Sequence, residues 1–102
     1  MTTHSAGSLQ VTVATDDRRF DGHFPGDPML PGACLMDLVI DALTAEGALT
    51  PAGVPRELAV AKFLAPVRPG DTVRIDWRRQ AGSLRFECRV AAVRVASGSL
   101  RC

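Results

Sequence analysis

The sequence predicts an α+β domain in which a mostly antiparallel sheet covers one long, apolar helix. Segments that alternate apolar and polar residues, as strands do, lie before residue 15 and again after residue 56. Between them, one apolar stretch has the length and composition of a buried helix. The later strands follow one another with short turns, which favours antiparallel neighbours. A sheet packed against a single helix is the simplest way to bury both apolar faces.

Length and composition indicate one domain spanning residues 1–102. The chain has 102 residues, of which 46% are hydrophobic, as in an ordinary globular protein. A domain of this size buries only about two-thirds of its unfolded surface, so we expect it to associate with another chain. No apolar run approaches the roughly 20 residues needed to cross a membrane. Met1–Ser8 has neither the basic start nor the apolar stretch of a secretory signal.

The first half of the chain predicts a strand followed by an irregular loop. Residues 8–14 alternate apolar and polar side chains and predict a strand. Asp16 to Asp21 is a charged turn. Residues 23–32 contain three prolines and two glycines, which exclude a regular helix or a central strand. This segment must therefore be an ordered loop or a short edge piece.

The apolar stretch from Ala33 to about Glu46 predicts a helix that ends at Gly47. Apolar residues surround most of its circumference, so we expect burial on most sides. Its polar residues, Asp37, Asp41 and Thr44, fall on a single stripe.

The second half predicts consecutive strands. Glu57–Leu64 reads as a strand, a turn is expected at residues 69–71, and residues 72–79 alternate clearly. After a turn at residues 81–82, residues 84, 86, 88 and 90 share one apolar face. Val93 and Val95 break that phase, so we predict a β-bulge or strand break near Ala91 and Ala92 that keeps both valines out of water.

Charge and cysteine content narrow the kinds of partner. The net charge is +1, but residues 1–51 hold seven acidic residues against two basic ones, whereas residues 52–102 hold ten basic against four acidic. The basic half is either a face for an acidic partner or the solvent side of strands. No aromatic residues accompany the arginines on the polar positions of the strands, which argues against nucleic acid as a partner. Cys34, Cys88 and Cys102 fit neither a disulfide framework nor a zinc site, and free thiols indicate a cytoplasmic protein.

The segment His23-Phe-Pro-Gly-Asp-Pro-Met-Leu-Pro-Gly32 resembles the active-site motif of the 3-hydroxyacyl-[acyl-carrier-protein] dehydratases, His-Phe-Pro-Gly-x-Pro-x-x-Pro-Gly. All seven fixed positions match, and Asp37 follows His23 by fourteen positions, where this family (FabA/FabZ-like) places its acid. An Asp at that position, and Asp27 inside the motif, are similar to the dehydratase/isomerase branch. The segment from Pro66 to Asp71 is similar to the family's turn between strands. In size the chain is similar to the small ApeI-like dehydratases of aryl-polyene pathways.

The resemblance implies a hotdog fold, in which an antiparallel sheet wraps around one long central helix. It also implies removal of water from a 3-hydroxyacyl thioester, with His23 and Asp37 as an acid/base pair contributed by two different subunits. Histidine suits the base, because its ordinary pKa of about 6.5 leaves it largely neutral at pH 7. A protonated carboxyl group at position 37 suits the acid that assists the leaving hydroxyl.

The start of the predicted helix suits the thioester carbonyl. Gly32 and Ala33 lie where backbone N–H groups and the helix dipole point toward whatever docks there. Together with Phe24 and Met29 of the motif, they are the expected substrate-binding residues.

The partners that the resemblance implies are an acyl carrier protein, whose phosphopantetheine arm holds the substrate, and a second hotdog chain in a homodimer or a mixed pair. No metal, redox cofactor, nucleic acid or membrane is expected. Arg18, Arg19 and Lys62 are candidate contacts to the acidic carrier, or ordinary solvated charges.

Alternatives remain at the level of single residues and of function. Asp37 could simply face water with Asp41, and Cys34 is more typical of packing than of a nucleophile. A hotdog thioesterase would use an acid on the same helix but usually lacks the His-Phe-Pro-Gly segment. A non-catalytic acyl-binding subunit would need neither His23 nor Asp37.

Overall fold

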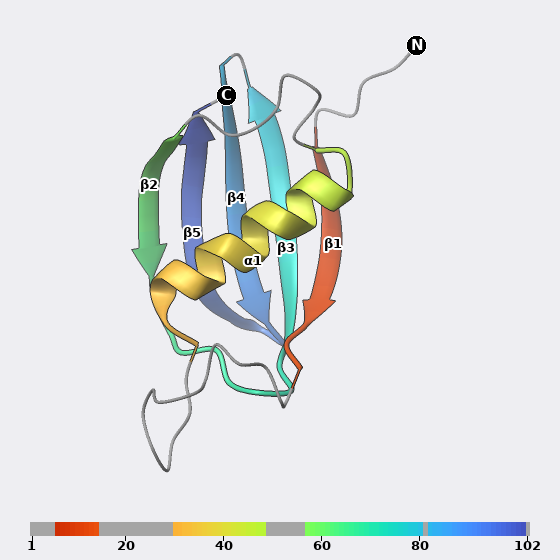
Figure 1. Cartoon of the computed structure of the whole chain (residues 1–102), viewed down its shortest axis with the longest axis vertical. Helices are drawn as coiled ribbons and strands as arrows, with labels where there is room; N and C mark the ends of the chain where they lie inside the picture. The colour runs from red at the N-terminus through yellow and green to blue at the C-terminus, as the bar shows by residue number, and fades with distance from the viewer. Residues whose placement is uncertain (1–5, 15–29, 49–56, 81, 102) are drawn as a thin grey trace.

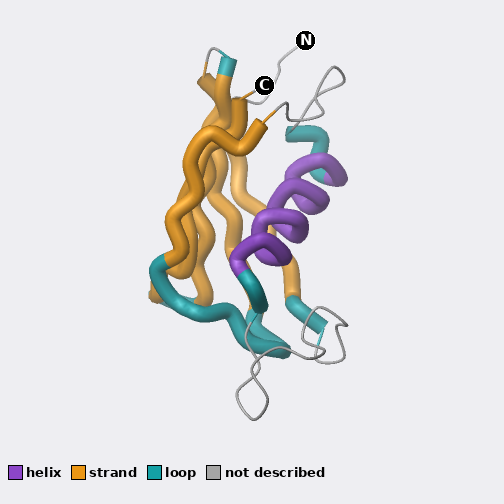
Figure 2. The backbone as a smooth tube through the Cα atoms, turned by 60° about the vertical axis from the view of Figure 1, so that its left-hand side comes forward, coloured by secondary structure: helices purple, strands orange, loops and turns teal. Residues whose placement is uncertain are grey.

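The computed structural model describes residues 6–14, 30–48, 57–80 and 82–101. These residues form β1 (Ala6–Thr12), α1 (Gly32–Ala45), β2 (Glu57–Phe63), β3 (Thr72–Gln80), β4 (Ser83–Val90) and β5 (Val93–Arg101). The strands make one antiparallel sheet in the order β1-β3-β4-β5-β2. Helix α1 crosses one face of this sheet (Figure 1), and helix and sheet form two layers (Figure 2). The predicted α+β class is confirmed.

Helix α1 begins one residue earlier than predicted and ends where Gly47 indicated. Pro31 occupies the N-cap position and accepts a 2.9 Å hydrogen bond from the Leu35 N–H. At the other end, Gly47 takes a φ of 81°, which a glycine adopts without strain. The N–H groups of Gly47 and Ala48 then bond back to the carbonyls of Thr44 and Leu43, at 3.1 and 3.0 Å. This pair of bonds is a Schellman motif, and it stops the helix.

The core lies between α1 and one face of the sheet. The helix buries one side, with Leu35, Met36, Leu38, Val39 and Leu43, so burial covers less of its circumference than predicted, and Ala33, Asp37, Asp41, Thr44 and Ala45 are exposed. The inward rows of β3, β4 and β5 complete the core with Val73, Ile75, Trp77, Leu84, Phe86, Cys88, Val95, Ala96 and Leu100. Each fully buried Leu or Val stabilises the fold by roughly 1.5–3 kcal/mol. The other face of the sheet, which we call the outer face, is opposite α1.

The strand break predicted near Ala91 and Ala92 is confirmed, because these two residues form the turn between β4 and β5. Ala91 takes a φ of 53°, a region that favours glycine. A β-bulge follows: Cys88 pairs with Ala96 but Arg89 pairs with Arg94, so Val95 is the extra residue. The bulge buries Val95. The expectation for Val93 was wrong, since its side chain is 55% exposed.

The segment between β2 and β3 fixes the start of α1 against the sheet. The turn after β2 is the predicted one, with Gly70 at a φ of 85° and the Arg68 N–H donating to Asp71 Oδ2 at 2.8 Å. Next to it, the Leu30 N–H donates to the Val67 carbonyl at 2.8 Å. The chain that leads into α1 is therefore held by the segment between β2 and β3.

Candidate active site

The N-terminus of α1 presents free backbone donors. Among the residues with described positions, no side chain caps this end of the helix, and the first turn carries no acidic residue. The early N–H groups of a helix have no partner inside the helix and favour a negatively polarised atom. The predicted contacts Gly32 and Ala33 both lie here, Gly32 half-buried and Ala33 exposed.

An aromatic side chain that the sequence analysis did not single out lies against this helix start. A Cβ built on Gly32 would come within 2.9 Å of Phe63 Cζ, so only a glycine lets the ring approach this closely. Phe63 is the last residue of β2 and is 52% exposed. The ring therefore walls one side of the helix N-terminus and remains accessible. The one signal of this contact in the sequence was Gly32 itself, a glycine at the start of a predicted buried helix where no turn requires one.

Asp37 lies on the exposed side of α1, five residues after Gly32. It shares its stripe with Asp41 and Thr44, which are exposed as well. The Thr44 hydroxyl donates back to the Ile40 carbonyl at 2.7 Å, whereas Asp37 has no hydrogen bond or ion pair to any described residue. The carboxyl group is therefore available to a ligand or to another chain.

The other predicted site residues are only partly placed. His23, Phe24 and Met29, with Arg18 and Arg19, lie outside the described residues, so the pairing of His23 with Asp37 stays a prediction. Lys62 is exposed on β2. In the described part of the chain, no three His, Cys, Asp or Glu side chains gather as a metal site would require. No helix there is long and apolar enough to cross a membrane.

The two described cysteines differ in their surroundings. Cys34 is half-buried in the first turn of α1 and packs against the core. Cys88 is fully buried, and burial, with smaller contributions from Asp76 and Glu87, raises the pKa of its thiol to about 12. A thiol that holds its proton this firmly is a packing residue and not a nucleophile.

Comparison with known proteins places this geometry in a family. A family model for ApeI-like dehydratases matches residues 1–99. The 3-hydroxyacyl-[acyl-carrier-protein] dehydratase FabZ of Thermomicrobium roseum is 38% identical over 81 residues, covering 71% of this chain and 50% of that protein. FabZ of Enterococcus faecalis is 32% identical over 102 residues, covering 86% and 70%. This chain spans about half the length of most of the curated relatives that it matches.

Solved structures share the same fold. A chain of the dehydratase heterocomplex ApeI:P from Xenorhabdus doucetiae superposes with a TM-score of 0.82 at 23% identity, over 97% of this chain and 88% of that one. The fluoroacetyl-CoA thioesterase FlK superposes with a TM-score of 0.69 at 16% identity, over 98% and 84%. At these identities the likeness concerns the fold alone, and it confirms the predicted hotdog architecture. With the family model matching nearly the whole sequence, the chain belongs to the ApeI-like family of hotdog dehydratases.

Proposed function

We propose that this protein removes water from a 3-hydroxyacyl thioester held on an acyl carrier protein, giving the trans-2-enoyl thioester. The observation that carries the proposal is the position of Asp37, which is exposed on α1, one to two turns beyond the helix N-terminus, and has no partner among the described residues. Five residues of helix correspond to a rise of roughly 7.5 Å. Because helix side chains lean toward the N-terminus, the Asp37 carboxyl group can reach back along this rise to a β-hydroxyl group only a few ångströms from a carbonyl bound at Gly32.

The reaction needs three groups, and the sequence supplies a candidate for each. His23 takes the weakly acidic proton from Cα as the carbon–carbon double bond forms. Asp37 gives a proton to the β-hydroxyl group, so that the Cβ–O bond breaks and water leaves. The free N–H groups at Gly32 and Ala33 stabilise the negative charge that grows on the thioester oxygen.

The site is proposed to form between two chains. Asp37 faces away from the core of its own chain, where a second chain can reach it. We infer a homodimer or a pair with a related hotdog chain, with His23 of one subunit facing Asp37 of the other. We also infer a cytoplasmic location, which agrees with the free thiols of Cys34 and Cys88.

The direct test uses 3-hydroxyacyl carrier proteins of several acyl lengths, with the product followed by intact mass. Dehydration lowers the mass of the loaded carrier by one water. A thioesterase would instead release the free acid and leave the unloaded carrier, and an acyl-binding subunit would leave the substrate unchanged. Either of these two results would refute the proposal.

Subunit mixing tests the composite site. In the homodimer, His23→Ala and Asp37→Asn chains should each be inactive alone, since loss of a general acid or base costs on the order of 10²–10⁴ in rate. Mixed in equal amounts, about half of the dimers contain one chain of each kind, and each such dimer has one intact site. Activity should return to about a quarter of wild type. No recovery after confirmed subunit exchange would refute a site shared between two copies.

A further inference from the structure

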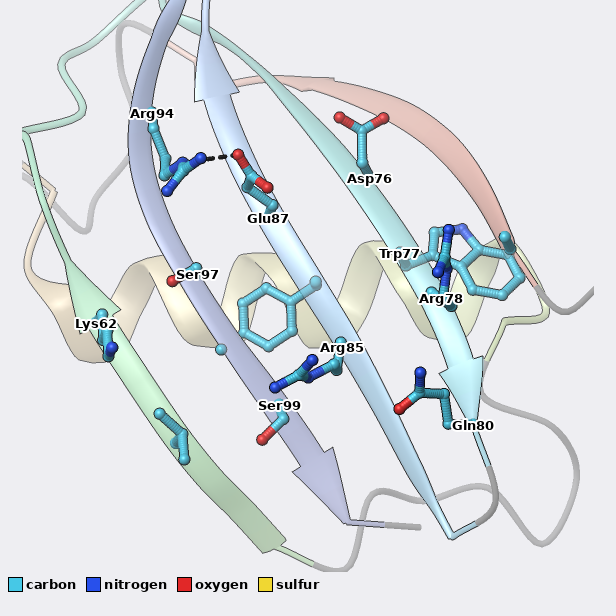
Figure 3. A pocket seen from close by; sticks show the side chains of 14 residues that line it. Lys62, Asp76, Trp77, Arg78, Gln80, Arg85, Glu87, Arg94, Ser97 and Ser99 are labelled. Carbon is cyan, nitrogen blue, oxygen red and sulfur yellow. Dashed lines mark hydrogen bonds and ion pairs between the residues drawn. The ribbon is translucent and has the colours of Figure 1, made fainter.

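The outer face of the sheet carries a broad hollow lined by charged side chains. Its volume is about 580 Å³, and all five strands contribute to its lining, β1 only through Ala6. Figure 3 shows the basic side chains that stand around it, which are Lys62, Arg78, Arg85 and Arg94. Two acidic residues, Asp76 and Glu87, share the hollow with them.

Both acids are already neutralised by arginines on one side of the hollow. Glu87 Oε1 accepts 2.7 Å contacts from Arg89 Nη2 and from Arg94 Nε. Asp76 Oδ1 accepts a 3.1 Å contact from Arg74 Nε. Arg89 and Arg94 lower the pKa of the Glu87 carboxyl group. Ser8 and Arg74 lower the pKa of the Asp76 carboxyl group. Neither acid is therefore free to pair with the remaining bases.

The remaining bases of the hollow have no counter-charge among the described side chains. Arg78 and Arg85 lie directly opposite each other in the register of β3 and β4. Like charges at such positions destabilise a sheet. Within the part of the chain that the structure describes, Arg78, Arg85 and Lys62 make no ion pair or hydrogen bond. The fold thus places the two arginines on facing positions of neighbouring strands, with no compensating contact from its own described residues. Figure 3 shows the Arg85 side chain extending toward Ser99 on β5 and away from Arg78.

The spacing and exposure of these cations favour an extended anionic partner over a small ion. All three side chains are exposed, so a single small anion would be held weakly in water. Neighbouring strands are about 4.8 Å apart, so Arg85 lies roughly 5 Å from Arg78 and roughly 10 Å across the sheet from Lys62. Lys62 thus lies roughly 15 Å across the sheet from Arg78. Carboxylates at positions i, i+4 and i+11 of a helix rise by about 6 and 16.5 Å, which fits this span.

We propose that the outer face docks an acidic helix of a partner protein through Arg78, Arg85 and Lys62. Arg78 and Arg85 each bind a carboxylate on successive turns of the helix, and Lys62 binds a carboxylate about two turns further along. Because this face lies opposite α1 and Asp37, the proposal does not depend on the proposed dehydratase activity (Figures 1 and 3).

The test uses a fluorescent, alanine-based helical peptide with glutamate at every i and i+4 position, titrated against the full chain at low salt. The wild type should bind it, and binding should weaken as salt is added. A peptide with glutamine in place of glutamate should not bind. The double variant Arg78→Gln/Arg85→Gln should bind the acidic peptide roughly tenfold more weakly. The single variant Arg85→Gln should also weaken binding, whereas Arg79→Gln, an equal change of charge outside the hollow, should not.

Several outcomes would overturn the proposal. These are no binding of the acidic peptide by the wild type, equal binding by the double variant, or equal weakening by Arg79→Gln. If inorganic phosphate displaces the peptide when its concentration equals that of the peptide's carboxylate groups, the face is a small-anion site instead. Light scattering that shows the wild type, but not the double variant, losing mass at high salt would assign the face to a second copy. The melting temperature of the double variant is the control for folding. It should not fall below that of the wild type, because Arg78 and Arg85 make no ion pair or hydrogen bond with described residues.

Discussion

Gly98 lies at one of the tightest points of the sheet, and its replacement by alanine should destabilise the fold strongly. Gly98 pairs with Phe86 across β5 and β4, and the Phe86 ring covers the space where a side chain would stand. A Cβ at position 98 would come within 2.7 Å of Phe86 Cζ and would collide with the backbone carbonyl oxygen of Val60. The ring can turn aside, but the carbonyl belongs to the neighbouring strand β2 and can move only with that strand.

Overpacking of this kind costs about 1–3 kcal/mol, and a backbone obstacle places Gly98→Ala toward the upper end. For a domain of about 100 residues, 1 kcal/mol lowers the melting temperature by about 4–8 °C, so we expect a drop of roughly 10–20 °C. Thermal unfolding followed by circular dichroism, with urea unfolding for the free energy, measures both quantities.

Two further variants separate the causes. Ser99→Ala, one residue along β5 and half-exposed, should change the free energy of unfolding by less than about 0.5 kcal/mol. Adding Phe86→Leu to Gly98→Ala should remove the ring contact but not the collision with Val60, so the double variant should not regain wild-type stability. A melting temperature for Gly98→Ala within a few degrees of wild type would show that β2 and β5 are not packed as described.

Three other predictions follow from the described residues. Asp37→Asn should abolish dehydration of the carrier-bound substrate, by about 10²–10⁴ in rate, whereas Asp41→Asn on the same stripe should not; equal losses would remove the special role of Asp37. Because arginines lower the pKa of Glu87 in the folded protein, its stabilisation is present above its ordinary value of 4.5 and is lost at lower pH. Urea midpoints of wild type and Glu87→Gln should therefore differ at pH 7 and converge toward pH 3. Since burial raises the pKa of Cys88 to about 12, iodoacetamide at pH 8.5 should leave its tryptic peptide unmodified unless urea is present, and labelling of the folded chain would contradict that burial.

The elements with a regular period could be predicted from the sequence. The alternation of β3 and β4 and the stop of α1 at Gly47 are local signals, and the structure confirms them. Strand β5 was not delimited as a strand of its own, because the bulge at Val95 places two consecutive residues, Val95 and Ala96, in the core and destroys the two-residue period. The exposure of Val93 has the same origin.

The candidate site was predictable in its residues but not in its surroundings. The motif and its spacing single out His23, Asp37 and Gly32, because short segments specify them. The wall that Phe63 makes against Gly32 joins residues thirty-one positions apart, and no periodicity reports such a contact. The charge asymmetry of the second half was visible, but the direct opposition of Arg78 and Arg85 needed the strand register.

The strand order β1-β3-β4-β5-β2 also has a consequence for how the chain folds. The three central strands are consecutive in sequence, so β3, β4 and β5 can zip together through short turns at little cost in chain entropy. Both edge strands must close long loops: Ala6 pairs with Arg78, and Glu57 pairs with Arg101. We expect the transition state for folding to contain the central meander and to lack both edges, so that mutations in β1 and β2 mainly speed unfolding. Amide exchange should then be slowest in β4, the strand that has neighbours on both sides from the earliest step.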